Sequence, residues 1–327
     1  MRVSRGIPSK ALAPVALTIG NFDGVHLGHC AMLKHLADSA RARALQSCVL
    51  TFEPHPREFF MPDSAPTRLT HLREKLEWFK ALGAQRTHIC RFDRGFAQLS
   101  AGEFIEHVIC RALDAKWLLV GEDFRFGKNR GGDFGYLQSA GKEYGFEVEL
   151  MPRVMVEGKR VASTLVRDAL AQGDLEQAAK WLGRPYSISG RVVHGDKTGR
   201  KIGFPTANIL IKHARPALTG IFVVELAGLC GRALKGVASL GVRPTVKENG
   251  LPLLEVHVLD FDKEIYGSHL RVDFLHKLRN EEKYPDVETL KAQIGRDVEN
   301  AKLFFNREGR GGNHEASHEN PDQTYPA

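Results

Sequence analysis

The chain lacks any apolar run close to the roughly 20 residues that a membrane-spanning helix needs. Its N-terminal segment, residues 1–14, carries charges but no long apolar stretch, so no secretory signal is expected. Its five cysteines are an odd number and stand far apart, and no Cys-x-x-Cys pair occurs. These spacings disfavour a disulfide framework and a zinc ribbon, and we expect reduced thiols in a cytoplasmic protein.

Clustered positive charge is also missing. The formal net charge is +7, but no block of five or more Lys or Arg residues occurs. A nucleic-acid-binding surface usually gathers its basic residues, so scattered ones favour an ordinary solvated surface. We expect no nucleic-acid or membrane partner, and a mild positive excess suits anionic small substrates. Nothing in the sequence indicates an oligomeric state.

The first half of the chain alternates short apolar runs with helical patterns. Strands are expected at Val15–Ile19, Cys48–Phe52, Thr87–Cys90, Trp117–Val120 and Phe146–Leu150. Helices are expected at Leu27–Ala44, His71–Leu82, 100–113 behind a capping box of Ser100 and Glu103, and Phe134–Tyr144. Alternation of this kind is typical of a parallel sheet covered by helices, which predicts a Rossmann-like α/β domain.

The second half has a different rhythm. Two short helices, near Thr164–Ala171 and Leu175–Leu182, end at a Gly-Arg-Pro sequence, 183–185, that breaks the pattern. Strand-like alternation follows, most clearly at Leu254–Val258 and Leu270–Phe274, and a last helix is expected from Asp286. We predict a small antiparallel β-barrel with a terminal helix. The expected boundaries are 1–184, 185–306 and a polar, disordered tail at 307–327.

One candidate site lies between the first expected strand and helix. Residues 20–29 read Gly-Asn-Phe-Asp-Gly-Val-His-Leu-Gly-His. A helix N-terminus offers free N–H groups to phosphates, and glycines allow close approach of the backbone. His26 and His29 share one face of the helix, where imidazoles can donate to a phosphate whose charge grows in the transition state. A metal site and ordinary surface histidines are the alternatives.

A second candidate site lies in the second half. Glycines at 195, 199 and 203 stand among Lys197, Arg200 and Lys201, and such a cationic loop can wrap phosphates through its backbone N–H groups. It is not a Walker A loop, because GxxxxGK[ST] does not occur in the chain. Thr206 and Asn208 offer hard oxygen ligands suited to Mg²⁺. Composition alone would equally allow a plain surface turn here.

The first segment resembles the opening motif of the HxGH nucleotidyltransferases. More narrowly, it is similar to the adenylyltransferase half of the bifunctional riboflavin kinase/FAD synthetase family. Three later segments resemble further motifs of that family: Thr-Phe-Glu-Pro-His-Pro at 51–56, Gly-Glu-Asp-Phe-Arg-Phe-Gly at 121–127 and Val-Ala-Ser-Thr-Leu-Val-Arg at 161–167. Two positions depart from the pattern, since Ala162 replaces a serine and Asp123 stands where some relatives carry Asn.

This resemblance implies a set of contacts to substrates. Flavin mononucleotide is expected near Asp123 and Arg125. Phe124 and Phe126 could contact flavin or simply fill the core. The residues implied in ATP binding are Gly20, Phe22, Asp23, Gly24, His26, Gly28, His29, Ser163, Thr164 and Arg167, with His26 and His29 also catalytic.

The second segment resembles the riboflavin kinase signature through Gly-Phe-Pro-Thr-Ala-Asn at 203–208, and the resemblance continues through 236–245, 254–257 and 278–281. It implies Glu255 as the acceptor of the proton from the ribityl 5′-hydroxyl, Mg²⁺ on Thr206 and Asn208, and flavin contact at Arg279. A solvent-facing strand glutamate is the alternative for Glu255. The implied ATP-binding residues of this half are Gly199, Arg200, Lys201 and Gly203.

Taken together, the two motif sets predict synthesis of FMN from riboflavin and ATP, followed by FAD from FMN and ATP. One alternative is an HxGH nucleotidyltransferase that acts on RNA, with the barrel as an RNA-binding module. Neither a clustered basic and aromatic surface nor a KMSKS-like loop supports it. The other alternative is a flavin carrier without turnover, against which the intact His26, His29, Thr206, Asn208 and Glu255 argue.

Overall fold

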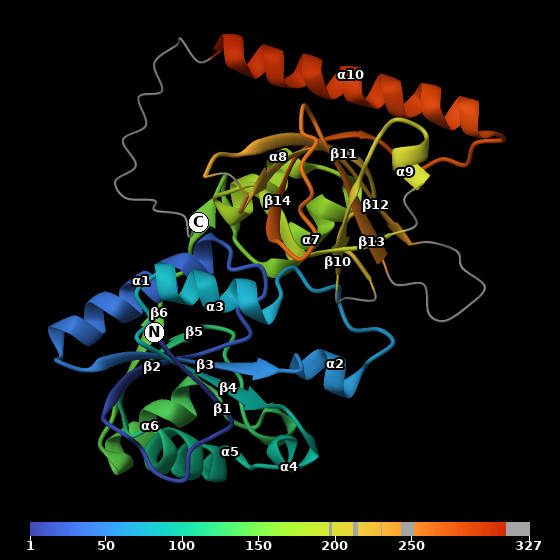
Figure 1. The fold of residues 1–327 in the computed structure, drawn as a ribbon. Coiled ribbons are helices and arrows are strands. Elements are labelled where there is room, and N and C mark those ends of the chain that lie inside the picture. Colours follow the sequence, from blue (N-terminus) through green and yellow to red (C-terminus); the bar gives the residue numbers. More distant parts are fainter. Residues whose placement is uncertain (196–197, 212–214, 230, 243–251, 312–327) are drawn as a thin grey trace. The chain divides into compact units, whose positions relative to one another are not determined.

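The computed structural model describes residues 1–195, 198–211, 215–229, 231–242 and 252–311 (Figure 1). Its backbone forms two compact units. The first unit comprises Met1–Pro66 and Thr70–Ser163, and the second comprises Thr67–Leu69 and the chain from Thr164 onward. Each unit has its own sheet and its own candidate site. Lys197 and the predicted tail beyond residue 311 lie outside the described residues.

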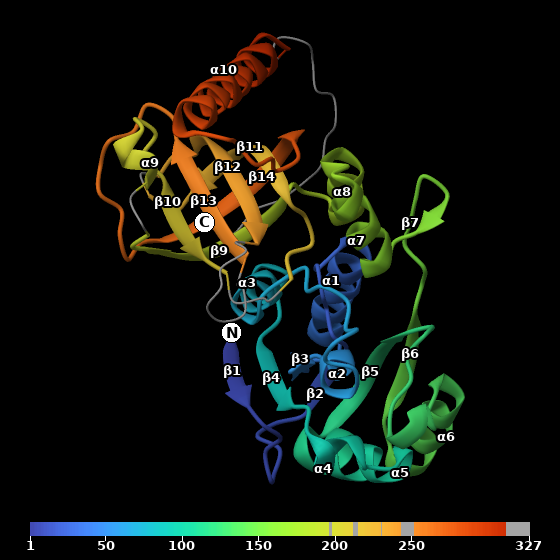
Figure 2. The same cartoon turned by 90° about the vertical axis from the view of Figure 1, so that its right-hand side faces the viewer.

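The first unit is built on a six-stranded sheet in which every neighbouring pair is parallel (Figure 2). The strand order is β1-β4-β3-β2-β5-β6. The strands are β1 (Arg2–Arg5), β2 (Val15–Ile19), β3 (Gln46–Glu53), β4 (Arg86–Arg91), β5 (Ala115–Gly121) and β6 (Glu147–Met151). Since β2 is followed by β3 on one side while β5 lies on its other side, the sheet is doubly wound with a switch point between β2 and β5. The predicted Rossmann-like fold is confirmed.

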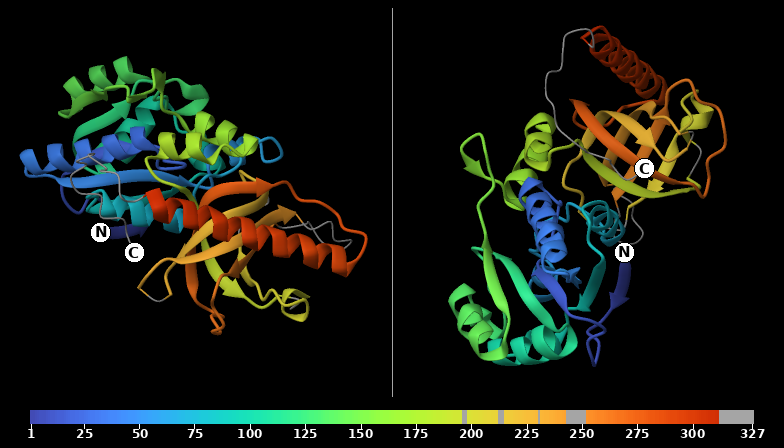
Figure 3. Two further views of the ribbon diagram at one scale, coloured as in Figure 1. Left: turned by 90° about the horizontal axis from the view of Figure 1, so that it is seen from above. Right: turned by 90° about the vertical axis from the view of Figure 1, so that its left-hand side faces the viewer.

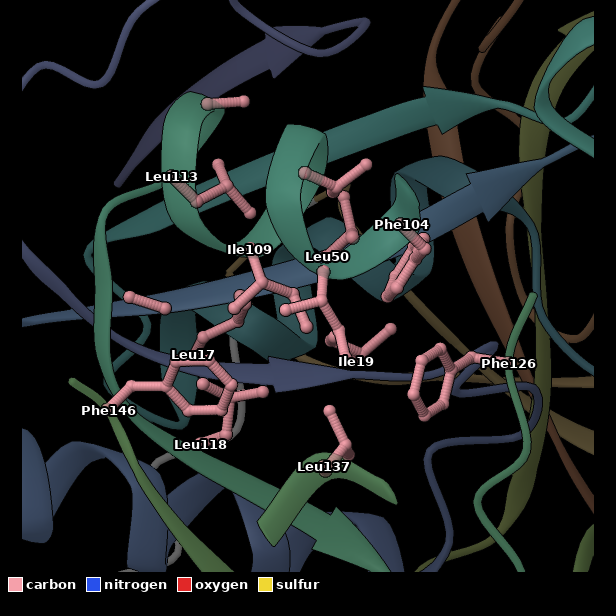
Figure 4. Packing of buried hydrophobic residues seen from close by; sticks show 14 of the residues in the cluster. Leu17, Ile19, Leu50, Phe104, Ile109, Leu113, Leu118, Phe126, Leu137 and Phe146 are labelled. Carbon is pink, nitrogen blue, oxygen red and sulfur yellow. The ribbon is translucent and has the colours of Figure 1, made fainter. Parts of the chain in front are cut away.

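Helices cover both faces of this sheet, so its central strands are buried on both sides. Leu17 and Leu50 face one cluster together with η1 (Figure 4). Ala16 and Val49 face another cluster with α1. Every residue of β2 is buried, as parallel strands between two helical layers require. The helices are α1 (Leu27–Ala42), α2 (Pro56–Phe60), α3 (Leu72–Ala81), α4 (Arg94–Ala97), α5 (Ala101–Glu103), η1 (Phe104–Ala112), η2 (Lys128–Arg130) and α6 (Phe134–Tyr144).

The second unit is a closed antiparallel barrel with the strand order β10-β13-β12-β11-β14-β9, in which β9 also pairs with β10. Alternate residues of β13 point inward, where Leu254 and Val256 are fully buried. The predicted barrel is therefore confirmed. Its strands are β9 (Tyr186–Val193), β10 (Ala207–Leu210), β11 (Gly220–Ala227), β12 (Leu234–Val242), β13 (Pro252–Val258) and β14 (His269–Arg279).

Helices lie on the outside of the barrel (Figure 3). The long terminal helix α10 (Val287–Gly311) covers the outer faces of Ile221 and Val237 with Val298, Ala301 and Phe305. Asp286 caps it, because its carboxylate accepts from the N–H of Thr289 at 2.7 Å. The other helices of this part are α7 (Ser163–Gln172), α8 (Leu175–Leu182) and the single turn α9 (Thr198–Lys201).

Some elements were not expected from the sequence. The edge strand β1 carries polar, mostly exposed residues, so it has no apolar alternation to reveal it. The strand β10 is short and coincides with the Thr-Ala-Asn motif. The hairpin of β7 (Met155–Val156) and β8 (Lys159–Arg160) has only two residues per strand. Helix α10 runs on to Gly311, into the first residues of the stretch that the sequence predicted as a tail.

Among the helices of the described ranges, none is both long and apolar enough to cross a membrane. The four cysteines that the structure describes, Cys30, Cys48, Cys90 and Cys110, are free thiols. Cys48 and Cys90 are buried in β3 and β4. Burial raises the pKa of each thiol to about 12, and the charge of nearby Asp93 adds to the effect at Cys90.

These pKa values predict selective alkylation of the native protein. At pH 8 a thiol of pKa 12 is ionised in about one molecule in ten thousand, and the thiolate is the reactive form. Iodoacetamide should therefore leave Cys48 and Cys90 unmodified in folded protein and label both in guanidinium, as read by peptide mass spectrometry. Equal labelling rates in both conditions would show that the two thiols are not buried in this way.

Candidate active sites of the two units

The first site begins in the loop that joins β2 to α1. Three of its residues adopt left-handed backbone conformations: Phe22 at φ 50°, Gly24 at φ 86° and Val25 at φ 39°. Such a conformation costs a non-glycine residue on the order of 1 kcal/mol, so tertiary contacts must hold it. The loop lies at the carboxyl end of β2, beside the switch point of the sheet, which is the edge where doubly wound folds bind ligands.

Buried contacts with Phe79 and Thr70 hold this loop in place. The ring of Phe22 is almost fully buried and packs edge-on against Phe79 at 5.2 Å. The carboxylate of Asp23 accepts from the N–H of Thr70 at 3.1 Å, and the hydroxyl of Thr70 accepts from Gly24 N–H at 3.0 Å. These contacts give Phe22 and Asp23 a clear role in shaping the loop. Neither side chain is exposed enough to cover much of a ligand.

The two predicted histidines meet at the start of α1. His26 is the N-cap residue, and its Nδ1 accepts from the N–H of His29 at 3.3 Å. Because Nδ1 is the acceptor, the ring proton of neutral His26 sits on Nε2. The imidazoles stack, with ring centres 3.7 Å apart and planes tilted by 14°. The two rings therefore lie side by side at the start of the helix.

The glycines of the loop leave room for these rings. A Cβ on Gly28 would lie 3.2 Å from the ring of His26, and one on Gly20 would lie 3.1 Å from the ring of Phe22. Ser163, the first residue of α7, donates from its hydroxyl to the carbonyl of Asp23 at 2.8 Å. Seven of the predicted residues from 20 to 29, together with Ser163, are thus brought together. Thr164 and Arg167 follow on α7, where Arg167 donates to the carbonyl of Thr67 at 2.7 Å.

The predicted flavin contacts lie after β5, the sheet neighbour of β2. Asp123 is mostly exposed and pairs with Arg160 of β8 at 2.5 Å. Its neighbour Glu122 pairs with Arg153, and that hydrogen bond lowers the pKa of the carboxyl. Arg125 donates to the carbonyl of Phe124 at 2.9 Å. The carboxylate at 123 is therefore neutralised by an arginine that sequence reasoning did not single out.

The second site is on the outer face of the barrel. Hydrogen-bonded register places Asn208 of β10 opposite Glu255 of β13, and Glu255 opposite Ser239 of β12. Directly opposed side chains on one face of a sheet lie about 5 Å apart at Cβ. Three polar residues that are far apart in the sequence thus form one row across three strands. Glu255 lies on the face opposite to the buried Leu254 and Val256.

A cavity of about 400 Å³ opens over this row. The predicted residues Gly199, Thr206, Asn208, Glu255 and Arg279 all line it. Apolar side chains from the barrel and from α10 form the rest of its wall, among them Ile221, Val237 and Ile294. An apolar wall with a few convergent polar groups is typical of a site for a flat organic ligand.

The glycine loop forms one rim of this cavity. A Cβ on Gly199 would lie 2.4 Å from the carbonyl oxygen of Phe204 and 3.3 Å from Thr206 Oγ1. A Cβ on Gly195 would lie 2.3 Å from Asn208 Nδ2. The lack of a side chain at these two glycines therefore lets both predicted metal ligands pack directly against the loop. Gly203 takes a left-handed turn at φ 91° after α9, and Arg200 lines a second hollow that shares Thr206. The side chain of Lys201 lies outside the described part of the chain.

Arg279, a predicted flavin contact that lines the cavity, also forms an ion pair with α10. Its guanidinium forms a bidentate salt bridge with Asp297 of α10, with Nε–Oδ1 at 3.0 Å and Nη2–Oδ2 at 2.7 Å. Burial alone would lower the pKa of Arg279, but the bonds and charge of Asp297 outweigh it and raise the pKa. Arg279 thus fastens α10 to the end of β14, and this pair shapes the cavity wall.

Sequence reasoning missed several residues that shape the sites. Thr70 and the almost fully buried Lys75, whose ammonium donates to the carbonyl of Asn21 at 3.3 Å, belong to no motif used above. His257 and Tyr284 line the barrel cavity. Strand alternation could have found His257, because it lies two residues after Glu255 on the same face of β13. Tyr284 follows the last strand in an irregular segment without such a signal.

Known proteins match both units. The FAD synthetase family model matches residues 9–165, and the riboflavin kinase model matches residues 182–305. The bifunctional riboflavin kinase/FMN adenylyltransferase of Haemophilus influenzae is 46% identical over 94% of this chain and 100% of its own length. Its counterpart in Escherichia coli is 47% identical over 93% and 98%. This chain belongs to the bifunctional riboflavin kinase/FMN adenylyltransferase family.

A solved structure extends this family likeness to the whole fold. A crystal structure from Streptococcus pneumoniae, described as a macrolide-efflux protein, superimposes with a TM-score of 0.77 at 28% identity. The match covers 92% of this chain and 99% of that one. Both the nucleotidyltransferase-type sheet and the barrel therefore occur together in that protein. The efflux description belongs to that protein alone.

The Arg279–Asp297 pair leads to a stability prediction. Arg279→Met leaves an almost fully buried carboxylate unpaired, so the free energy of unfolding of the barrel unit should fall by about 3–5 kcal/mol. Arg279→Met/Asp297→Leu removes both charges and should lose less. Guanidinium unfolding followed by circular dichroism measures both variants, and a double variant as unstable as the single one would contradict the argument.

Proposed function

We propose that this chain makes FAD from riboflavin in two ATP-dependent steps, one in each unit. Riboflavin and ATP give FMN and ADP, and FMN and a second ATP give FAD and pyrophosphate. The single observation that carries the proposal is the meeting of Asn208, Glu255 and Thr206 at one apolar-walled cavity, in a chain whose other unit holds the stacked His26 and His29. Full-length likeness to enzymes with both activities supports it.

In the barrel, Glu255 would accept the proton of the ribityl 5′-hydroxyl while that oxygen attacks the γ-phosphorus of ATP. The bond from the γ-phosphorus to the β,γ-bridging oxygen breaks, and ADP leaves. The flavin ring would lie against the apolar wall near Ile221 and Val237. The raised pKa of Tyr284, caused by burial and by its hydrogen bond to Glu282, keeps this phenol protonated at the rim.

Thr206 and Asn208 fit a magnesium ion with few protein ligands. Their oxygens are hard donors, both residues line the cavity, and magnesium usually keeps several waters besides its protein ligands. Magnesium bound there would offset charge on the phosphates of ATP. Within the described ranges, no group of three His, Cys, Asp or Glu residues has the arrangement of a metal cluster. Gly199, Arg200, Lys201 and Gly203 would wrap the phosphates, and Arg279 would act on the flavin site through α10.

In the first unit, a phosphate oxygen of FMN would attack the α-phosphorus of ATP, and pyrophosphate would leave. His26 can donate from Nε2, because its Nδ1 is occupied by the N–H of His29. His29 would donate a second hydrogen bond to the phosphates of ATP. The backbone of Gly20, Gly24 and Gly28 would allow these phosphates to approach closely. Ser163, Thr164 and Arg167 would hold phosphates at the start of α7. FMN would lie near Asp123 and Arg125, with Arg160 offsetting the carboxylate.

The RNA-modifying alternative is not proposed, because both family models and the full-length relatives are flavin enzymes. The absence of a nucleic-acid partner and a location in the cytoplasm stay predictions. So do the domain boundaries at 184 and 306.

The two activities should be separable by mutation. Glu255→Gln should lower FMN formation from riboflavin by at least about a hundredfold while leaving conversion of supplied FMN to FAD unchanged. His26→Ala should lower conversion of supplied FMN to FAD and leave FMN formation from riboflavin unchanged. Chromatography of flavins over time measures both reactions, and wild-type protein should show FMN before FAD. Loss of neither reaction in either variant would show that the residue assignment is wrong.

Gly28→Ala offers a finer test of the first site. Its methyl group would press on the imidazole of His26 from 3.2 Å, so adenylyl transfer should slow by about tenfold or more. Gly135→Ala, on α6 of the same unit, is the matched control, since its methyl would meet only Asp133 Oδ1 at 3.5 Å. Equal FAD synthesis rates in the two variants would contradict the proposed part of His26.

A further inference from the structure

His257 is a cavity-lining residue to which the proposed mechanism assigns no part. It lies on β13 two residues beyond Glu255, on the same outer face of the barrel. Its Nδ1 is 2.8 Å from the carbonyl oxygen of Pro205. A carbonyl can only accept, so Nδ1 carries the proton and donates to it. The ring also meets the ring of Phe204 edge-on, with centres 5.6 Å apart and an interplanar angle of 84°.

The segment that His257 contacts links the turn after α9 to the first residue of β10. Residues 204–206 belong to no strand or helix, and the ladder between β10 and β13 begins only at Ala207. The amide of Phe204 donates to the carbonyl of Gly199 at 2.8 Å, which closes the turn after α9. Between that turn and β10, the ring of Phe204 packs against the cluster that contains Ile221 and Val237, and the bond from His257 to Pro205 fixes the backbone immediately before Thr206.

The two proposed metal ligands, Asn208 and Thr206, are held in place in different ways. Asn208 is placed by the strand register, directly opposite Glu255. Thr206 precedes the ladder, so no register places it. It does follow immediately on Pro205, whose carbonyl His257 fixes. Strand β13 thus has two roles. Its backbone places Glu255, the proposed proton acceptor, and its His257 side chain fixes Pro205, the residue before Thr206.

We infer that His257 is a positioning residue for phosphoryl transfer, which sets Thr206 relative to Asn208 and Glu255 through its hydrogen bond to Pro205. The inference rests on the proposed function of the barrel. The inferred role is one of position, because the hydrogen bond of His257 runs to a backbone carbonyl next to Thr206. A misplacement of about 1 Å at a reacting centre can cost about a hundredfold in rate.

Two nearly isosteric substitutions test the hydrogen bond. The side-chain amide nitrogen of Asn can occupy the place of Nδ1 and donate to Pro205, whereas Leu has a similar branched shape and no donor. His257→Leu should lower kcat for FMN formation by about 10- to 100-fold and raise the Mg²⁺ concentration needed for half-maximal rate. His257→Asn should recover most of both. Conversion of supplied FMN to FAD, in the other unit, should be unchanged in both variants, and the guanidinium unfolding transition of the barrel unit serves as the folding control.

The pH dependence of the kinase rate separates positioning from proton transfer. The Leu variant should keep the shape of the wild-type profile at a lower plateau, while loss of one limb of the profile would overturn the inference. Two other results would also overturn it: a Leu variant within twofold of wild type, or an Asn variant as slow as Leu. Wild-type protein that makes no FMN from riboflavin would instead refute the proposed function itself.

Discussion

The hydrogen-bonded register between β10 and β13 is the constraint on which the barrel site depends. It sets Asn208 opposite Glu255, and the neighbouring ladder with β12 adds Ser239 to the same row. A shift of one residue would turn Glu255 into the barrel and Leu254 out of it, because side chains alternate along a strand. The buried Leu254 and Val256 therefore stabilise this register, because a shift of one residue would expose both side chains to water and lose the free energy of their burial.

In the first unit, a loop and not a strand register positions the proposed reactive residues. Three left-handed residues between β2 and α1 bring His26 to the N-cap of a helix at the edge of the sheet. The strain is balanced by the buried Phe22 ring and by the contacts of Asp23 and Gly24 with Thr70. Both units thus place their proposed reactive groups on backbone that the core holds rigid, and surface side chains contribute little to that rigidity.

Local patterns predicted much of this molecule. Apolar runs located β2 with its observed bounds, and the capping box of Ser100 and Glu103 marked the start of α5. Alternation in Leu254–Val258 placed Glu255 on the outer face before any barrel was seen. Elements without such a pattern were missed, among them the polar edge strand β1 and the short β10. Arg279 lines the barrel cavity and also pairs with Asp297, a partner that no motif indicated.

By itself, the sequence determined the α/β and barrel classes, the order of the two units and the motifs at 20–29 and 203–208, because periodicity and motif spacing are local properties of a chain. Only the tertiary structure decided which distant residues meet. Thr70 reaches Asp23, Arg160 reaches Asp123, and His257 reaches Pro205 through the pairing of strands and the packing of loops on the core. Such contacts join segments that carry no mutual signal in one sequence, so their partners follow from the fold and from no local rule.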